Sequence, residues 1–228
     1  MLKGFNCTII SIVGDYMKVF LIRHGESIQN VGKSEGVIDP DIYLTDKGKE
    51  QAYNTGIKLK EYLIENDIDT SNSRMWVSPY LRTEQTAKAV NESLNIKSVF
   101  YDPRLVEKDF GIYDGIDPSK WGEIDSVTFK RVDAKYQSIR GRFFSRLPNG
   151  EAPFDVYNRI STFIETIFRD DKDPIFIVSH GDTIRCLIMR WLHKDLNWYY
   201  DESLPTNASV ILIDKNENNK YDYKTIIN

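Results

Sequence analysis

The chain has 228 residues, enough for one large α/β domain or two small ones with a sizeable core. Its hydrophobic fraction of 41% and charged fraction of 28% are those of an ordinary globular protein. The formal net charge of −4 disfavours a general nucleic-acid or membrane-surface binder, because such proteins present a basic surface.

Cysteine usage and the N-terminal stretch bear on the compartment. Cys7 and Cys186 lie in no CxxC or other metal-ligand spacing. They imply no disulfide framework, so a reducing compartment, the cytoplasm, is expected. The apolar stretch over residues 4–14 is shorter than the ~20 residues that span a bilayer, and it lacks a signal-peptide cleavage site. We expect residues 1–16 to be an extension, either a strand or a flexible segment, ahead of a domain over residues 17–228.

Short apolar runs and helical repeats alternate along the rest of the chain. The runs predict buried strands, and apolar residues at helical spacing predict helices. The predicted elements in chain order are a strand over 18–23, a helix over 45–63, a strand over 75–77, a helix over 79–93, a strand over 98–101, a helix around 156–167, a strand over 175–179, a helix ending near 192, and a hairpin of strands over 208–213 and 221–227. This alternation predicts an α/β fold of three α/β/α layers with a mostly parallel central sheet.

Local signals refine some of these elements. Thr45 is predicted to cap its helix, whose inner face carries small residues that suggest close approach to the sheet. Ser78 is predicted to cap the next helix, with Pro79 at the first helical position. Residues 112–150 show no clear period and carry glycine, proline and many charges, so we expect a loop-rich insertion there, in part helical.

Two of the three histidines follow predicted strands in similar settings. His24 and His180 each come at a strand end and precede a glycine, which lets a ligand approach the backbone. Ligands of parallel sheets bind at the carboxyl ends of the strands. A single histidine after a strand is more often structural, but two at equivalent strand ends indicate a functional site.

Arginines add the second part of the pattern. Arg23 precedes His24, and Arg82 falls in the first turn of the helix over 79–93. The free N–H groups and the positive dipole end of that helix favour an anion, and guanidinium groups suit phosphate oxygens. The sequence has no HExxH, cysteine cluster or Walker loop, so neither a metal site nor a cofactor is expected. The segment 214–219 imitates half of a calcium loop, but a hairpin turn is favoured because the required glycine and final acid are absent.

The segment Leu21–Asn30 contains Arg23-His24-Gly25 and resembles the signature of the histidine phosphatase superfamily, also called the phosphoglycerate mutase-like family. Further segments resemble the family's motifs and follow in the family's order, namely Tyr43–Gly48, Ser78–Ala87, Leu105–Gly111 and Val178–Gly181. Because these motifs span nearly the whole chain, the resemblance implies the phosphoglycerate mutase-like fold.

The resemblance also implies roles for individual residues. His24 would be the nucleophile that becomes phosphohistidine, and Glu107 would protonate the leaving oxygen and then activate water. The implied phosphate-binding residues are Arg23, Asn30, Arg82, His180 and the amide of Gly181. The nucleophile must attack as neutral imidazole, which the ordinary histidine pKa of ~6.5 already favours and two neighbouring arginines would reinforce. The acid must be protonated, so we expect burial to raise its pKa or the enzyme to prefer mildly acidic conditions.

Departures from the family pattern favour a phosphatase over a mutase. Mutases of the family usually carry Thr/Ser-Gly-Trp after the Arg-His-Gly motif and a paired Arg-Arg further on. Residues 31–39 contain no tryptophan, and Arg140-Gly141-Arg142 replaces the adjacent arginines. Residues 140–159 are instead similar to a branch of plant and fungal phosphoglycerate mutase-like phosphatases. Hydrolysis of phosphomonoesters is therefore expected, with mutase activity as the alternative.

Other questions stay open at the level of the sequence. Arg140, Arg142 and Arg146 would either contact the far end of the substrate or pair with acids such as Glu151 and Asp155. A non-catalytic phospho-ligand binding protein is the least favoured interpretation, because such relatives typically lose the nucleophile or the second arginine. The expected partner is a small phosphorylated substrate, with no nucleic acid and no membrane.

Overall fold

The computed structural model describes residues 17–34, 37–116, 118–124, 126–127, 130–131, 141–170 and 172–228. Residues 1–16, predicted as an extension, and Arg140 lie outside the described residues. The division of the chain into an extension and a domain with an insertion stays a prediction.

A six-stranded sheet with the order β3-β2-β4-β1-β5-β6 forms the middle layer. Its strands are β1 (Val19–Arg23), β2 (Arg74–Val77), β3 (Val99–Tyr101), β4 (Ile175–Ser179), β5 (Val210–Lys215) and β6 (Tyr221–Ile227). The pairs β3-β2, β2-β4 and β4-β1 are parallel, whereas β1-β5 and β5-β6 are antiparallel. The predicted mostly parallel sheet and its closing hairpin are confirmed.

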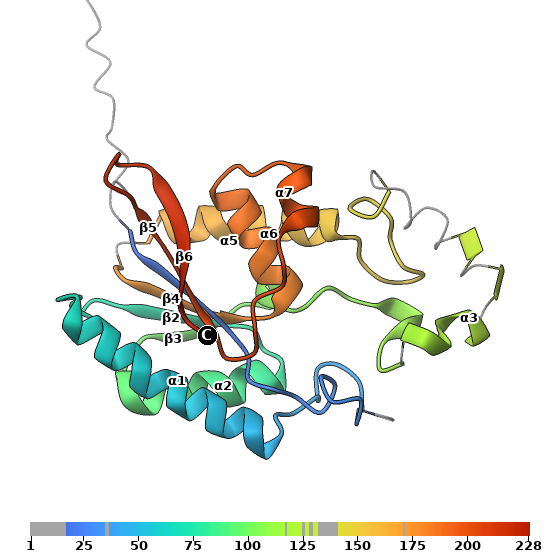
Figure 1. The fold of residues 1–228 in the computed structure, drawn as a ribbon, viewed down its shortest axis with the longest axis horizontal. Coiled ribbons are helices and arrows are strands. Elements are labelled where there is room, and N and C mark those ends of the chain that lie inside the picture. Colours follow the sequence, from blue (N-terminus) through green and yellow to red (C-terminus); the bar gives the residue numbers. More distant parts are fainter. Residues whose placement is uncertain are drawn as a thin grey trace, which may run out of the picture.

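Helices cover both faces of this sheet (Figure 1). One face carries α1 (Asp46–Glu65) and α2 (Leu81–Leu94), and the other carries α5 (Pro153–Phe168), α6 (Gly181–Trp191) and the short α7 (Leu196–Asp201). Helices α1, α5 and α6 were expected from residues at helical spacing and α2 from its start signals, whereas α7 was not expected. The predicted three-layer α/β/α arrangement is therefore confirmed.

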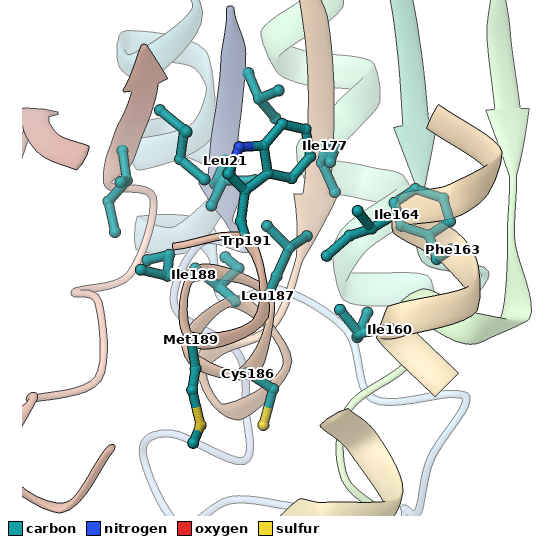
Figure 2. Close-up of a cluster of buried hydrophobic side chains, with 14 of the residues drawn as sticks. Leu21, Ile160, Phe163, Ile164, Ile177, Cys186, Leu187, Ile188, Met189 and Trp191 are labelled. Carbon is teal, nitrogen blue, oxygen red and sulfur yellow. The ribbon is translucent and has the colours of Figure 1, made fainter. Parts of the chain in front are cut away.

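Strand β1 contributes side chains to the hydrophobic clusters on both faces of the sheet. Val19 and Leu21 pack into the cluster under α5 and α6, while Phe20 and Ile22 pack into the cluster under α1 and α2. All four are at most 1% exposed, because alternate side chains of a strand point to opposite faces of the sheet. Figure 2 shows the first cluster, where Leu21 meets side chains of α5 and α6.

Helix α1 begins where the sequence predicts. The hydroxyl of Thr45 accepts a hydrogen bond from the Gly48 amide at 3.0 Å, the expected N-cap. The small residues of this helix serve a different contact from the predicted one. A Cβ on Gly48 would lie 1.9 Å from the carbonyl oxygen of Glu26, and one on Gly56 would lie 2.8 Å from that of Val90. They let α1 approach the loop after β1 and helix α2, rather than the sheet.

The region 112–150 contains only short helical pieces among its described residues. They include η2 (Gly111–Tyr113), η3 (Pro118–Lys120) and α3 (Trp121–Ile124), and η1 (Pro103–Leu105) precedes them. Its described residues lie on the side of the molecule where β1 and β4 end (Figure 1). None of the described helices is long and apolar enough to cross a membrane.

Candidate active site

The two strand-end histidines meet at one point. Strands β1 and β4 are parallel neighbours with Arg23 opposite Ser179, so the next residues, His24 and His180, lie side by side. Their ring centroids are 5.2 Å apart, and the His24 amide donates to the Ser179 carbonyl at 3.0 Å. The side chains are only 4% and 0% exposed. The juxtaposition expected from the sequence is thus present in the fold.

The hydrogen bonding of His24 defines its tautomer. Its Nδ1 lies 2.8 Å from the carbonyl oxygen of Gly25. Because a carbonyl can only accept, Nδ1 carries the hydrogen and Nε2 keeps its lone pair. Burial, followed by the charges of Arg82 and Arg23, holds the pKa of His24 well below its ordinary value. The imidazole is therefore neutral, with its lone pair on Nε2.

His180 is held by a residue for which the sequence suggested another role. Its Nε2 lies 2.8 Å from the hydroxyl oxygen of Ser78. The prediction that Ser78 caps helix α2 is wrong, because that helix begins at Leu81 with Tyr80 as N-cap and without a side-chain cap. The hydroxyl faces the neighbouring strand end instead, and burial and Arg82 hold the pKa of His180 well below its ordinary value.

Arg23 and Arg82 lie beside the histidines, each tied by its terminal nitrogens. Arg23 donates from Nη1 to the carbonyl of Pro205. Arg82, which is 1% exposed, pairs through both terminal nitrogens with the carboxylate of Asp39. The Nε atoms of the same two arginines, in contrast, are buried without a hydrogen-bond partner among the described residues. The same is true of His180 Nδ1.

Asp39 had not been singled out in the sequence. It lies in a polar loop before a proline, and nothing in its local pattern marks it as an arginine partner. Its position depends on the fold, since its own amide donates to Asp114 at 3.2 Å and brings two distant loops together. The Arg82 guanidinium also lies 5.2 Å from the ring of Tyr80, whose pKa is raised to about 12 by burial and by Asp39.

The helix start that serves the site is α6 rather than α2. In α2, the Leu81 amide donates to the Pro40 carbonyl at 3.0 Å and the Thr83 amide to the Tyr80 carbonyl at 3.0 Å. The prediction that free amides of α2 hold an anion is therefore wrong for these two donors. Helix α6 begins directly after His180, which is its N-cap, and its positive end faces the site.

The carboxylate of Glu107 lies on the first turn of α6. Its Oε1 accepts from the amides of Lys108 at 2.9 Å and Thr183 at 3.3 Å, and its Oε2 accepts from the amide of Asp182 at 3.3 Å. Glu107 is half-buried and held by these hydrogen bonds, so it is not a solvent-exposed surface residue. Burial and the neighbouring Asp182 raise the pKa of Glu107, the direction that a general acid requires.

The other expected phosphate contacts lie at the rim of the site. Asn30 is exposed, and its Oδ1 accepts from the Ser27 amide at 2.9 Å and from Asn207 Nδ2 at 3.1 Å. The same Asn207 nitrogen donates to the His24 carbonyl at 3.2 Å, a link that the sequence did not reveal. These contacts orient the Asn30 side chain through its oxygen, and the predicted contact of its amide nitrogen with a phosphate stays a prediction.

The glycines after the two histidines differ. A Cβ on Gly25 would lie 2.3 Å from the carbonyl oxygen of Gly48, so Gly25 is required by helix α1 and not by a ligand. A Cβ on Gly181 would make only ordinary contacts of 3.5 Å with Arg23 and Leu204. Gly25 is therefore explained by the packing of α1, whereas the approach of a ligand to the Gly181 backbone stays a prediction.

The described contacts decide between the two alternatives for Arg146. Arg146 binds both carboxylate oxygens of Asp155, at 2.7 and 2.5 Å, as the ion-pair interpretation expected. Glu151 instead binds Arg159, at 2.9 and 3.0 Å. Arg142 is exposed, and its predicted contact with a substrate stays a prediction. Among the described residues, no group of three or more His, Cys, Asp or Glu is arranged to hold a metal ion.

Comparison with known proteins identifies the family of the chain. Residues 19–223 match the histidine phosphatase superfamily (branch 1). Phosphoglycerate mutase-like protein AT74 of Arabidopsis thaliana is 30% identical over 222 residues, which cover 90% of this chain and 66% of that protein, so the chain spans about two thirds of that relative's length. Broad-range acid phosphatase DET1 of Saccharomyces cerevisiae is 27% identical, with 92% and 89% of the two chains covered. The α-ribazole phosphatase of Shigella flexneri shares the fold, with a TM-score of 0.74 at 23% identity and with 93% and 96% covered. The chain belongs to the histidine phosphatase superfamily.

Proposed function

We propose that this protein is a phosphatase that hydrolyses small phosphomonoesters through a phosphohistidine on His24. One observation carries the proposal: His24, with its lone pair on Nε2, lies near His180, Arg23 and Arg82, and each of these three side chains has a buried nitrogen without a hydrogen-bond partner among the described residues. These nitrogens are Arg23 Nε, Arg82 Nε and His180 Nδ1. Phosphoryl transfer depends mainly on positioning and on donors at the phosphoryl oxygens, which is what such a cluster supplies.

In the proposed first step the substrate phosphate lies among these donors. If the Ser78 hydroxyl donates to His180 Nε2, then His180 Nδ1 carries a hydrogen and donates to a phosphoryl oxygen. The Gly181 amide and the Asn30 side chain add contacts. His24 Nε2 attacks phosphorus, the bond to the ester oxygen breaks, and the proton of Glu107 passes to the leaving oxygen.

The second step reverses the role of Glu107. Its carboxylate accepts a proton from water while the water oxygen attacks the phosphorus of phosphohistidine. The bond to Nε2 breaks, inorganic phosphate leaves, and both His24 and Glu107 return to their starting states. The low pKa of His24 supports this step as well as the first, since a neutral imidazole is regenerated without taking a proton.

The relatives support hydrolysis in general terms. One curated relative is called an acid phosphatase, and the raised pKa of Glu107 agrees with work below neutral pH. The absence of the mutase-type tryptophan and paired arginines from the sequence supports the same choice. Contacts of Arg140 and Arg142 with the far end of the substrate, and a cytoplasmic location, remain predictions.

The test compares His24→Asn with His193→Asn in the release of inorganic phosphate from 4-nitrophenyl phosphate. His193 is exposed, and asparagine suits its backbone φ of 51°, so this variant is a matched control. We expect His24→Asn to lose at least about 10³-fold in kcat/KM and the control to keep its activity. Acid-labile labelling of wild type by ³²P-substrate should vanish in His24→Asn. Retained turnover in that variant, or phosphate exchange between the positions of phosphoglycerate without net hydrolysis, would refute the proposal.

A further inference from the structure

A buried lysine lies next to the proposed general acid. Lys108 is 4% exposed, and its Nζ lies 3.0 Å from the carboxylate of Asp182 and 4.9 Å from the ring of Phe110. Lysine is rarely buried unless paired, since its ammonium loses hydration. Neither this lysine nor its partner has a role in the proposed transfer of the phosphoryl group.

The ion pair closes a ring of contacts around the acid. The amide of Lys108 donates to Glu107 Oε1 at 2.9 Å, and the amide of Asp182 donates to Glu107 Oε2 at 3.3 Å. The side chains of the same two residues bind each other at 3.0 Å. The ion pair therefore links two backbone donors, one for each oxygen of the carboxylate.

The far side of Asp182 is itself fixed. Its Oδ1 accepts from Arg185 Nη2 at 2.5 Å and from the Tyr199 hydroxyl at 2.9 Å. The Arg185 guanidinium also lies 4.0 Å from the ring of Tyr199. Because residues of α6 and α7 hold the aspartate in this way, Lys108 is tied through Asp182 to both helices.

A separate contact holds the backbone of the acid's segment. Arg159 donates to the carbonyl of Arg104 at 2.6 Å and to that of Glu107 at 3.1 Å. Loss of Lys108 would leave these hydrogen bonds in place, and Asp182 would keep Arg185 and Tyr199. The segment should then stay folded while the carboxylate gains freedom.

We propose that Lys108 and Asp182 are positioning residues that aim the carboxyl group of Glu107 at the leaving oxygen of the substrate. The inference rests on the proposed function, because it requires Glu107 to be the general acid. Proton transfer depends steeply on geometry, so a side chain free to rotate protonates the leaving oxygen less often.

The leaving group gives a test that separates positioning from simple loss of structure. Phenolate is a poor leaving group that needs its proton, whereas 4-nitrophenolate leaves with little help. We therefore expect Lys108→Met to lower kcat/KM for phenyl phosphate by about 10-fold or more, and for 4-nitrophenyl phosphate by less than about 3-fold. Lys108→Arg, which keeps the cation, should restore most of the loss. Lys18→Met is the matched control, since Lys18 pairs with Asp214 at 3.7 Å at the other end of β1.

The pH dependence of kcat/KM provides a second test of the positioning role. The charged and titratable groups around the Glu107 carboxyl are Asp182 and Cys186 on α6, Lys108 on its own segment, Arg82 on α2, Arg23 on β1 and Arg159 on α5. Asp182 raises the pKa of Glu107 and Lys108 lowers it. The alkaline limb of kcat/KM should therefore move to higher pH in Lys108→Met and to lower pH in Asp182→Asn.

The outcomes distinguish this inference from the proposed function. Glu107→Gln should show a strong dependence on the leaving group, and equal losses for both substrates in Lys108→Met would then overturn the positioning role alone. If Glu107→Gln shows no such dependence while His24→Asn is inactive, Glu107 is not the acid and the inference falls with it. Should Lys108→Met fail to fold, Asp182→Asn breaks the same ion pair at constant size, and unchanged selectivity in that variant would overturn the inference.

Discussion

The carboxylate of Asp39 binds both terminal nitrogens of Arg82 and thereby holds a fully buried guanidinium in place. A phosphate group, like a carboxylate, can bind a guanidinium through two oxygens. The carboxylate of Asp39 and a bound phosphate would therefore both interact with the single positive charge of Arg82. Asp39 thus orients Arg82 and at the same time repels the anion that Arg82 is proposed to bind.

Asp39→Asn should therefore tighten the binding of inorganic phosphate. The amide keeps an oxygen for Arg82 but removes the negative charge, and a unit charge within a few ångströms at a partly buried site changes binding by at least about 1.4 kcal/mol, or tenfold. The measurement is the competitive inhibition constant of phosphate. Asp41→Asn, an exposed change in the same loop, is the control and should leave it unaltered. Weaker inhibition in Asp39→Asn would show that orientation outweighs repulsion.

The pH dependence of hydrolysis should have its optimum below neutrality. The pKa of His24 is lowered, so the nucleophile stays neutral well into the acidic range. The pKa of Glu107 is raised, so the acid stays protonated above the usual range and is lost as pH rises through its shifted pKa. The alkaline limb of kcat/KM for phenyl phosphate should therefore belong to Glu107 and disappear in Glu107→Gln. A limb that persists in this variant would assign it to another group.

Stability should fall in acid because the two site histidines are buried in the neutral form. The pKa of His180 is lowered on folding, so below about 6.5 the unfolded chain binds a proton that the folded chain does not. Its stabilising contribution is complete above that pH and is lost as pH falls, by about 1.4 kcal/mol per unit. His180→Gln should flatten the decline of the unfolding free energy between pH 6.5 and 5 by about 2 kcal/mol. The exposed His193→Gln should not, and equal slopes in both variants would contradict the assignment.

Gly48→Ala should disturb both stability and the site. The new Cβ would lie 1.9 Å from the carbonyl oxygen of Glu26, a backbone atom that cannot move aside without shifting the loop after His24. Overpacking of this kind costs about 3 kcal/mol, measurable by urea denaturation. Asn54→Ala, on the exposed face of the same helix, should change the unfolding free energy by less than about 0.5 kcal/mol. A stable and fully active Gly48→Ala would show that the loop adapts.

The layered fold was predictable because its signals are local. The continuous apolar run of β4 and the helical repeat of α5 bury the residues that their periods indicate. The hairpin of β5 and β6 likewise follows from two strand patterns around a polar turn. Helix α7 escaped prediction because six residues are too few to show a period.

The sequence by itself determined the succession of strands and helices along the chain and the family. It also determined that His24 and His180 lie close together, because the carboxyl ends of parallel strands lie at the same edge of the sheet. Only the tertiary structure decided which residues hold that site in place. Ser78 binds His180 instead of capping a helix, and Asp39 binds Arg82 from a separate loop. Lys108 pairs with Asp182, which lies far from it in the sequence. Buried polar and charged groups need a partner that is close in the folded molecule, and residues far apart in the chain can supply it. The local periodicity of the sequence does not show which residues these are.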